Sequence, residues 1–466
     1  MSVQPQDCAP NRDDSADDCD NDVTTNPSST SCQCSLAGDE DDSWIAARDM
    51  TLLNALDSDP GPRFRRLSKA ARPVRLVGEG AANAVFEIRD SADFNKKHVF
   101  PPRCSSKSPA PLPGLLLRVA KVPSRDCPPT YNYLFQQNFY QTSIQPLLDG
   151  YAVHQELVVI RKSGIVDKLN KLLQEIDSSR KQKFRGTSVG QSDWAFLVQD
   201  MRPADPDECL LIEFKPKWLC QSPSAPPAAV RCRQCAMELR NLIKNPERDL
   251  PETKPCPLTL ANPDAPSQAR CPFRIAPQLA GIDVDDNFRR ALETVANHPA
   301  LRQLKTQQQR HDRLGPLASE PSSAFLVAMT LRDCTCFVQI PRHQQEPLLL
   351  RLGDFDWKDP QVKFKGWRKA EQDLIDGAFY TADLILCGDS YYHPPTLCAL
   401  ECAPRPPRAD LPHLLNIQRG TSMEIQTEMK MFNHRADVTA LQQRLEKFRI
   451  APTEEPLAAR RRFLTS

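Results

Sequence analysis

The stretch LIEFKPKW, residues 211–218, is an apolar run that ends in two lysines separated by a proline. Its apolar residues, with those of Leu210–Phe214, predict a β-strand. Pro216 cannot continue a central strand, and its ring restricts the backbone. The side chains of Lys215 and Lys217 should therefore have fixed directions. Lysine binds phosphate as a point charge, and two aimed lysines therefore indicate a phosphate site. The alternative is a strand edge whose lysines simply reach solvent.

Two segments upstream add to this hypothesis. The string VGEGAANAV, residues 77–85, lies between apolar runs. It fits a hairpin loop whose small residues let backbone amides approach phosphates. In LLLRVAKV, residues 115–122, Arg118 interrupts a buried strand, and an interior charge needs a partner such as a bound phosphate. The alternative for Arg118 is an edge strand on which it faces water.

Two segments downstream place acids at strand edges, LRDCTCF at residues 331–337 and LRLGDFDWK at residues 350–358. Carboxylate oxygens are the hard ligands that Mg²⁺ requires, and a separate carboxylate can orient or deprotonate an attacking hydroxyl. Asp333 and Asp354 are the candidates for these two roles. Taken singly, each aspartate is equally explained as a turn former or a helix cap.

Charge is unevenly distributed along the 466 residues, whose formal net charge is +1. Residues 1–60 carry a balance of -12, which leaves 58 basic and 45 acidic residues for the rest of the chain. The positive charge of residues 61–466 favours binding of a polyanion, which could be nucleic acid, an anionic membrane surface or a polyphosphate. Seven tyrosines and five tryptophans without a stacking platform argue against a specific nucleic-acid partner. No apolar run approaches the length that membrane insertion needs.

The composition divides the chain into four parts. The N-terminal part is rich in Asp, Ser, Asn and Pro, which predicts disorder. From Val74 onward, short apolar runs alternate with helical spacing such as that of Ile144–Ile176, which indicates an α+β fold. Apolar residues over Met423–Phe448 predict a helix outside the main core. We expect a disordered acidic tail, an N-terminal lobe, a C-terminal lobe and a partly helical or disordered extension, at residues 1–70, 71–200, 201–387 and 388–466.

In combination, the five strings resemble the inositol-pentakisphosphate 2-kinase family in its fungal form. The EFKPK string at 213–217 is similar to the family's ExKPK signature, and the other strings follow the family's order over roughly residues 74–385. The resemblance implies a two-lobed fold related to inositol polyphosphate kinases and protein kinases, with an ATP cleft between the lobes. It implies Mg²⁺-dependent transfer of the ATP γ-phosphate to the 2-hydroxyl of inositol 1,3,4,5,6-pentakisphosphate, giving the hexakisphosphate, phytate. The alternative is a non-catalytic inositol-phosphate-binding pseudokinase or scaffold, against which the presence of both Asp333 and Asp354 argues.

The resemblance also implies the roles of individual residues. The implied catalytic residues are Lys215 near the transferred phosphate, Asp333 as the base for the hydroxyl, and Asp354. The implied Mg²⁺ ligands are Asp354 and Asp356. The implied nucleotide contacts are Gly78, Glu79, Gly80, Ala81, Ala82, Asn83, Arg118, Gln199, Met201, Glu213 and Arg274. The implied inositol-phosphate contacts are Arg185, Lys215, Lys217, Arg233 and Lys358.

The chain departs from the family pattern in places. Ala236-Met237 stand where the family has a Met-His pair, and Cys271 replaces an asparagine before Arg274. Some relatives hold a structural zinc, but Cys232 and Cys235 lack an evident second pair, so zinc is not expected here. Cys398 and Cys402, near His393, are equally explained by packing. We expect a monomer in the nucleus, the cytoplasm or both, where such relatives act.

Overall fold

The computed structural model describes residues 64–89, 114–125, 127, 131–276, 286–342, 347–404, 413–418 and 430–465. These residues form two compact units, the first ending at Arg202 and the second beginning at Pro203. Most of the predicted acidic tail lies outside the described residues. Ordered structure begins before the predicted end of that tail at residue 70, because Arg65–Arg66 form a strand and Leu67 is buried.

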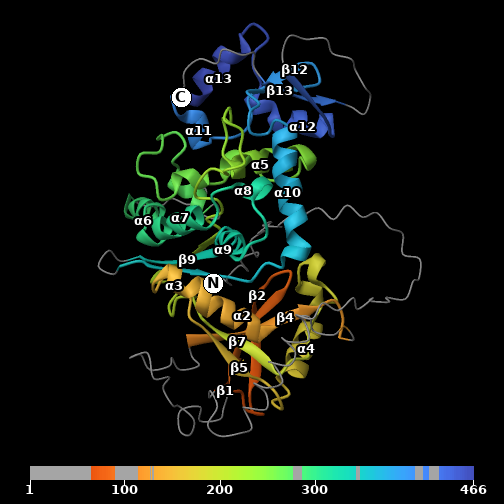
Figure 1. Ribbon diagram of the computed structural model, residues 1–466, viewed down its shortest axis with the longest axis vertical. Coiled ribbons are helices and arrows are strands. Elements are labelled where there is room, and N and C mark those ends of the chain that lie inside the picture. Colours follow the sequence, from red (N-terminus) through yellow and green to blue (C-terminus); the bar gives the residue numbers. More distant parts are fainter. Residues whose placement is uncertain are drawn as a thin grey trace, which may run out of the picture. The chain divides into compact units, whose positions relative to one another are not determined.

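The N-terminal unit is built on a mixed seven-stranded sheet (Figure 1). The strand order is β1-β5-β7-β4-β3-β2, and β6 pairs with β4. The strands are β1 (Arg65–Arg66), β2 (Arg72–Glu79), β3 (Asn83–Arg89), β4 (Leu115–Val122), β5 (Gln155–Val159), β6 (Ser188–Val189) and β7 (Trp194–Gln199). The helices are α2 (Tyr133–Phe139), η2 (Tyr140–Ile144), α3 (Gln145–Leu148), α4 (Ile165–Glu175), η3 (Asp177–Ser179) and η4 (Gln182–Phe184).

Both faces of this sheet are covered, as the alternation along β7 shows. Ala195 and Leu197 pack with α4, whereas Trp194 and Phe196 pack on the other face with Tyr133 of α2. Successive side chains of a strand point to opposite faces, so a strand apolar at every position is a buried central strand. This is why β4 and β7, which are apolar at most positions, form the middle of the sheet.

The C-terminal unit contains a three-stranded antiparallel sheet of order β10-β9-β8. Its strands are β8 (Cys209–Phe214), β9 (Thr335–Pro341) and β10 (Leu349–Gly353). Phe214 pairs with Cys336, and Gly353 pairs with Thr335. Because neighbouring strands run in opposite directions, the end of β8, the start of β9 and the end of β10 meet at one edge. The predicted phosphate and acid motifs therefore share this edge.

The described residues of the C-terminal unit also form six helices and three short helical turns in this part of the chain. The helices are α5 (Arg233–Lys244), α6 (Asp286–Ala296), α7 (Pro299–His311), α8 (Gly315–Ala318), α9 (Ser323–Leu331) and α10 (Pro360–Asp376), with the short turns η5 (Pro251–Thr253), η6 (Pro257–Thr259) and η7 (Pro272–Ile275). Helices α7 and α9 lie side by side next to β9 (Figure 1). Ser322 caps α9 by accepting from the Phe325 amide, and the nearly all-apolar α9 is buried.

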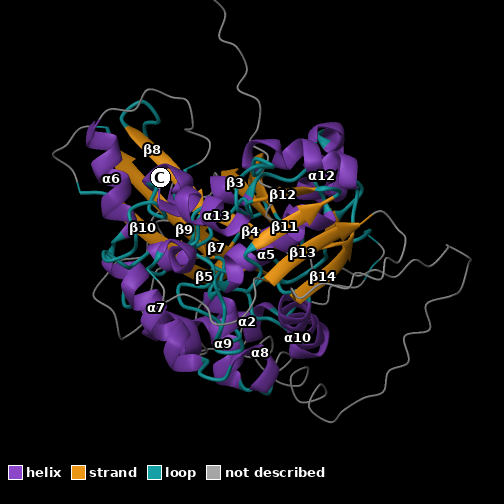
Figure 2. Cartoon of the chain, turned by 90° about the horizontal axis from the view of Figure 1, so that it is seen from above, coloured by secondary structure: helices purple, strands orange, loops and turns teal. Residues whose placement is uncertain are grey.

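The last part of the chain forms a second sheet in this unit, of order β12-β11-β13-β14. Figure 2 shows its four strands side by side. The elements are β11 (Leu384–Cys387), β12 (Ser390–Tyr392), α11 (Ala399–Cys402), β13 (His413–Gln418), β14 (Lys430–Arg435), α12 (Val438–Leu445), η9 (Glu446–Phe448) and α13 (Pro456–Thr465). Of the helix predicted over Met423–Phe448 outside the core, residues 423–429 lie outside the described residues, Val438–Leu445 is helical, and the rest of the prediction is wrong. Lys430–Arg435 is a strand paired with β13, and Leu441 and Leu445 belong to the main core. In the described part of the chain, no helix combines the length and apolar character needed to cross a bilayer.

Candidate active site

Two lysines leave the end of β8 in a fixed conformation. Pro216 is buried, and Lys217 has a φ of 54°. That left-handed conformation is unfavourable for a residue with a side chain and persists only where the surroundings hold it. The proline and the constrained Lys217 backbone therefore aim both side chains along the edge of the sheet.

The lysines converge on one carboxylate. The Lys215 Nζ lies 3.2 Å from Asp333 Oδ1 and also donates to the Asp333 carbonyl at 3.1 Å. The Lys217 Nζ lies 3.4 Å from the same Oδ1, and the Lys358 Nζ lies 2.5 Å from Oδ2. The Lys215 Nζ is also 3.7 Å from Asp354 Oδ2. We call these five residues the lysine–aspartate cluster: Lys215, Lys217, Asp333, Asp354 and Lys358.

The charges in this cluster are strongly coupled. Burial alone would raise the pKa of Asp333, but Lys358, Lys217 and Lys215 together lower this pKa well below its usual value. Burial would likewise lower the pKa of Lys358, but the Asp333 carboxylate raises it. Asp333 is therefore ionised across the neutral range.

Asp354 differs from Asp333 in its surroundings. It follows β10 directly, has a φ of 62°, and its side chain is 42% exposed. Asp356, two residues later, accepts at its main-chain carbonyl from Thr330 Oγ1 at 3.3 Å. Accessible carboxylate oxygens are a donor set that fits Mg²⁺, which keeps several of its own waters. Asp354 thus offers an accessible carboxylate of the kind that Mg²⁺ prefers, and its metal role with Asp356 remains a prediction.

Arg233 reaches the same region from the start of α5. It is buried, its Nε lies 2.6 Å from Glu371 Oε2, and its guanidinium lies 4.4 Å from the centre of the Trp218 ring. Glu371 is itself held by Ser222 Oγ and the Tyr380 hydroxyl. The structure thus brings Arg233 next to the residue that follows Lys217, with part of its charge already matched by Glu371.

Other predicted residues of this unit lie outside the cluster. Glu213 is an exposed residue of β8. Arg274 is half-buried in η7, and its Nη1 donates to the Ala269 carbonyl at 3.0 Å. The predicted nucleotide roles of both residues remain predictions.

The predicted glycine loop is the turn of the β2–β3 hairpin in the N-terminal unit. Gly80, Ala81 and Ala82 are exposed at this turn, which the Gly80 amide closes by donating to the Asn83 carbonyl at 2.9 Å. Gly78 and Glu79 end β2, and Asn83 begins β3. The small residues of the motif thus form an exposed turn, in which the Gly80 amide and the Ala82 carbonyl are already hydrogen-bonded.

The interior charges of this unit have protein partners that the sequence did not reveal. The Glu79 carboxylate pairs with Lys121 Nζ at 2.8 Å and with Arg180 Nη2 at 2.5 Å. Burial would raise the pKa of Glu79, but these two cations lower it. Arg118 is buried and lies opposite Val85 and Phe196 in the middle of the sheet. The alternative of an edge strand with Arg118 facing water is therefore wrong.

Three further predicted residues lie elsewhere in the N-terminal unit. Gln199 ends β7, and Met201 is buried just after it. Arg185 is exposed and donates to the carbonyls of Arg180 and Ser178. Gln199 and Met201 thus lie among the last residues of this unit, and their nucleotide roles remain predictions.

A group of four cysteines was missed by the sequence reasoning. The Sγ atoms of Cys232, Cys235, Cys256 and Cys398 all lie within 4.8 Å of one another. The Cys232–Cys256 and Cys256–Cys398 Sγ distances are 3.9 and 3.7 Å. Four thiolates at roughly 2.3 Å from a tetrahedral zinc lie about 3.8 Å apart, so this spacing fits a structural zinc site. The prediction that Cys232 and Cys235 lack a second pair is wrong.

The surroundings of these thiols suit a metal better than a disulfide. All four cysteines are free, and sulfurs this far apart are not disulfide-bonded. Hydrogen bonds from Cys232, Cys235 and Cys398 lower the pKa of the Cys256 thiol well below its usual value. The sequence does not reveal the second pair of cysteines, because Cys256 lies in a proline-rich segment and Cys398 caps a four-residue helix far along the chain.

We expect the purified chain to contain about one zinc, since a four-cysteine set normally binds one ion. Replacing Cys256 by serine removes a ligand and should abolish the bound zinc, as measured by elemental analysis, and lower the melting temperature. The matched control is Cys402→Ser, because Cys402 packs beside the four thiols without belonging to them. Equal zinc content in both variants would contradict a four-cysteine site.

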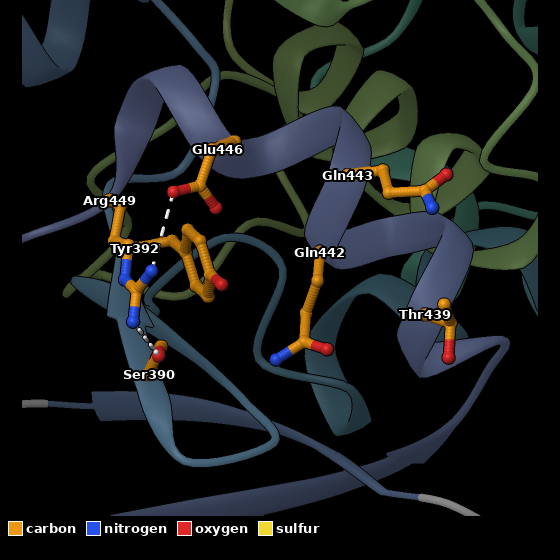
Figure 3. Close-up of a pocket in the computed structure, with 7 residues that line it drawn as sticks. All are labelled: Ser390, Tyr392, Thr439, Gln442, Gln443, Glu446 and Arg449. Atoms are coloured by element: carbon orange, nitrogen blue, oxygen red, sulfur yellow. Dashed lines mark hydrogen bonds and ion pairs between the residues drawn. The ribbon is translucent and has the colours of Figure 1, made fainter.

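A separate pocket lies elsewhere in the C-terminal unit. Figure 3 shows this pocket, of about 480 Å³, between β12, α12 and η9, with Arg449 bonded to Ser390 and Glu446 at its wall. None of the residues lining it was predicted to be functional: Ser390, Tyr392, Thr439, Gln442, Gln443, Glu446 and Arg449. The charged edge of the β8–β10 sheet, rather than this pocket, is therefore the candidate site.

Comparison with known proteins agrees with the chemistry of that edge. A family model described as inositol-pentakisphosphate 2-kinase matches residues 77–274 and 278–373, which is well over half of the chain. A curated relative named inositol-pentakisphosphate 2-kinase, from Yarrowia lipolytica, is 30% identical over 177 residues, covering 37% of this chain and 54% of the relative. The chain thus spans about half the length of the curated relative it matches. The chain belongs to the inositol-pentakisphosphate 2-kinase family.

Proposed function

We propose that this chain is an ATP-dependent kinase that phosphorylates the 2-hydroxyl of inositol 1,3,4,5,6-pentakisphosphate, giving the hexakisphosphate. The observation that carries the proposal is the convergence of Lys215, Lys217 and Lys358 on Asp333, with Asp354 beside them. A pentakisphosphate next to ATP brings many negative charges together, and a cluster of cations is required to offset their repulsion. Family membership makes this substrate the first to test.

The mechanism follows from an exchange of counter-ions. In the described structure, the Asp333 carboxylate accepts from all three lysines. Substrate phosphates compete for Lys217 and Lys358, and the pKa of Asp333 rises as these ammonium groups turn away from it. The freed carboxylate takes the proton of the 2-hydroxyl while that oxygen bonds to the γ-phosphorus and the bond to the β-phosphate oxygen of ATP breaks.

Lys215 and Asp354 have complementary tasks in this proposal. Lys215 lies between the two carboxylates, so its ammonium group is placed to stabilise charge on the moving phosphoryl group. Asp354, with Asp356, would hold Mg²⁺, which offsets the negative charge of the ATP phosphates. Arg233, beside Trp218, would complete the inositol-phosphate site.

The nucleotide contacts proposed for the N-terminal unit rest on the hairpin turn and the sheet behind it. The exposed turn residues Ala81 and Ala82 would let phosphate oxygens approach the backbone, and Arg118 belongs to β4, which pairs with the second strand of the hairpin. We also propose the two-lobed kinase arrangement, Gln199 and Met201 as adenine contacts, and the nucleus or cytoplasm as the location. These proposals rest on the family resemblance.

The second candidate function is binding without catalysis, because the Asp333 carboxylate of the described structure is fully engaged by lysines. Incubation with ATP, Mg²⁺ and inositol 1,3,4,5,6-pentakisphosphate, followed by chromatographic separation, distinguishes the two. We expect hexakisphosphate and ADP in equal amounts. Tight binding of the pentakisphosphate without any product would instead identify a scaffold.

Replacing Lys217 by alanine should raise KM for the inositol phosphate more than KM for ATP. The loss of one charge-assisted hydrogen bond, about 1.5 to 3 kcal/mol, corresponds to roughly tenfold to hundredfold weaker binding. The matched control is Lys369→Ala, since that side chain is 72% exposed on α10. Steady-state kinetics with each substrate varied in turn measures the effect, and equal increases of both KM values would contradict the assignment.

A further inference from the structure

One glutamine of helix α7 connects the two segments that carry the proposed catalytic groups. Gln308 is the middle residue of the run Gln307–Gln309, and it is completely buried, whereas Gln309 is exposed. A buried amide is retained only where its polar atoms are satisfied. The sequence of three glutamines gives no reason to choose among them, and the fold singles out Gln308.

The partners of Gln308 come from both sides of the lysine–aspartate cluster. Its Nε2 donates to the carbonyl of Lys217 at 2.9 Å and to the carbonyl of Leu331 at 3.2 Å. Its Oε1 accepts from the amide of Leu219 at 3.0 Å. Leu331 ends helix α9 two residues before Asp333. One side chain therefore ties the backbone of Lys217 to the chain that leads into Asp333.

The next turn of the chain adds a second connection between the same two segments. Asp312 caps the end of α7, and its buried Oδ2 accepts from Arg332 Nη1 at 2.6 Å. The Arg332 guanidinium lies 3.5 Å from the centre of the Trp218 ring. Arg332 precedes Asp333, and Trp218 follows Lys217. The contact between Arg332 and Trp218 therefore links the same two segments that Gln308 links.

These hydrogen bonds hold an unfavourable backbone conformation at Lys217. A left-handed conformation of a residue with a side chain, such as Lys217 at a φ of 54°, is unfavourable and needs support from its surroundings. The hydrogen bonds to the Lys217 carbonyl and the Leu219 amide supply that support on both sides of Trp218. Without them the backbone can relax, and the Lys217 ammonium group moves from its place near Asp333.

We propose that Gln308 is a positioning residue that sets the placement of Lys217 relative to Asp333, an inference that rests on the proposed kinase function. The task requires an amide, because the site offers two acceptors and one donor. Glutamate has no donor for the two carbonyls, and methionine has the right size without either kind of hydrogen bond. Asparagine keeps the amide but is one methylene too short to reach all three partners.

The test compares Gln308→Met and Gln308→Asn with the matched controls Gln309→Met and Gln309→Asn. We expect kcat/KM for the inositol phosphate to fall about tenfold to hundredfold at position 308, because small displacements of reacting groups have effects of this size. At position 309 we expect a change of less than twofold. Melting temperatures identify the folded variants, and Gln308→Asn is the milder change should the methionine variant not fold.

A double-mutant cycle separates positioning from general stability. If Gln308 acts through Lys217, then Gln308→Met should have only a small further effect in the Lys217→Ala background. Additive losses, or a Gln308→Met protein as active as Gln309→Met, would overturn the proposal.

Hydrogen exchange at the Leu219 amide tests the positioning role of Gln308 without measuring kinase activity. The amide should exchange faster in Gln308→Met than in Gln309→Met, whether or not the wild type turns over, and equal exchange rates would count against positioning. A wild type that forms no hexakisphosphate would count against the proposed function alone.

Discussion

Replacing Asp333 by asparagine should abolish turnover while the protein still binds inositol pentakisphosphate, and binding should become tighter. Asparagine cannot accept the hydroxyl proton, and loss of a general base typically lowers kcat by about 10² to 10⁴-fold. The substitution also removes the carboxylate that engages all three lysines in the described structure. The lysines would then be available to phosphates without competition. Single-turnover kinetics and calorimetric titration measure the two effects separately.

The control for this variant is Asp376→Asn, since Asp376 is exposed at the end of α10. That protein should match the wild type in both measurements. A normal rate in Asp333→Asn would remove Asp333 from the role of base. Much weaker binding would show that the carboxylate organises the lysines instead of competing for them.

The same carboxylate predicts how stability depends on pH. The lysines hold the folded-state pKa of Asp333 below its unfolded value of about 3.9. Its ion pairs therefore contribute stability above the unfolded pKa, and this contribution is lost as the pH falls through the folded pKa. Denaturant unfolding below pH about 4 should show this loss in the wild type and not in Asp333→Asn.

Replacing Glu401 by glutamine should lower the free energy of unfolding by about 3 to 5 kcal/mol, because breaking a buried ion pair leaves an uncompensated charge. The Glu401 Oε1 lies 2.8 Å from Arg231 Nε and 2.6 Å from Arg460 Nη2, and all three side chains are buried. This carboxylate joins α13 to the segment before α5. Glutamine preserves its shape but leaves two buried guanidinium groups without their counter-ion.

Chemical denaturation measures this effect. The control is Glu446→Gln, whose side chain is 61% exposed and pairs with Arg449 on the surface. Such a pair contributes at most about 1 kcal/mol. If Glu401→Gln were as stable as Glu446→Gln, the buried network would not be the anchor of the C-terminal helix.

The edge of the β8–β10 sheet could be predicted because its chemistry is local in sequence. The apolar run before Lys215 gives the strand, Pro216 ends it, and the acids of the other two motifs directly flank their own strands. Antiparallel pairing then brings the three strand ends together. The residues alone gave these strand ends, and the family resemblance placed Lys215, Lys217, Asp333 and Asp354 in one site.

Groups joined across long sequence separations could not be predicted in this way. Arg180 lies 101 residues from Glu79, and nothing in either segment indicates that they pair. Cys232 and Cys235 have the spacing of half a zinc motif, but Cys256 lies in a proline-rich loop and Cys398 at a later short helix, so no second pair is visible in the sequence. The stretch Lys430–Arg435 is a strand because β13 offers it a partner, although its composition also suits a helix.

Phosphorus NMR of the product made from inositol 1,3,4,5,6-pentakisphosphate tests the central claim most directly. The cluster of lysines around Asp333 predicts that the wild type, with ATP and Mg²⁺, adds a sixth phosphate at the 2-position, and that Asp333→Asn adds none. Absence of a sixth phosphate with the wild type, or equal amounts of it with both proteins, would contradict the account.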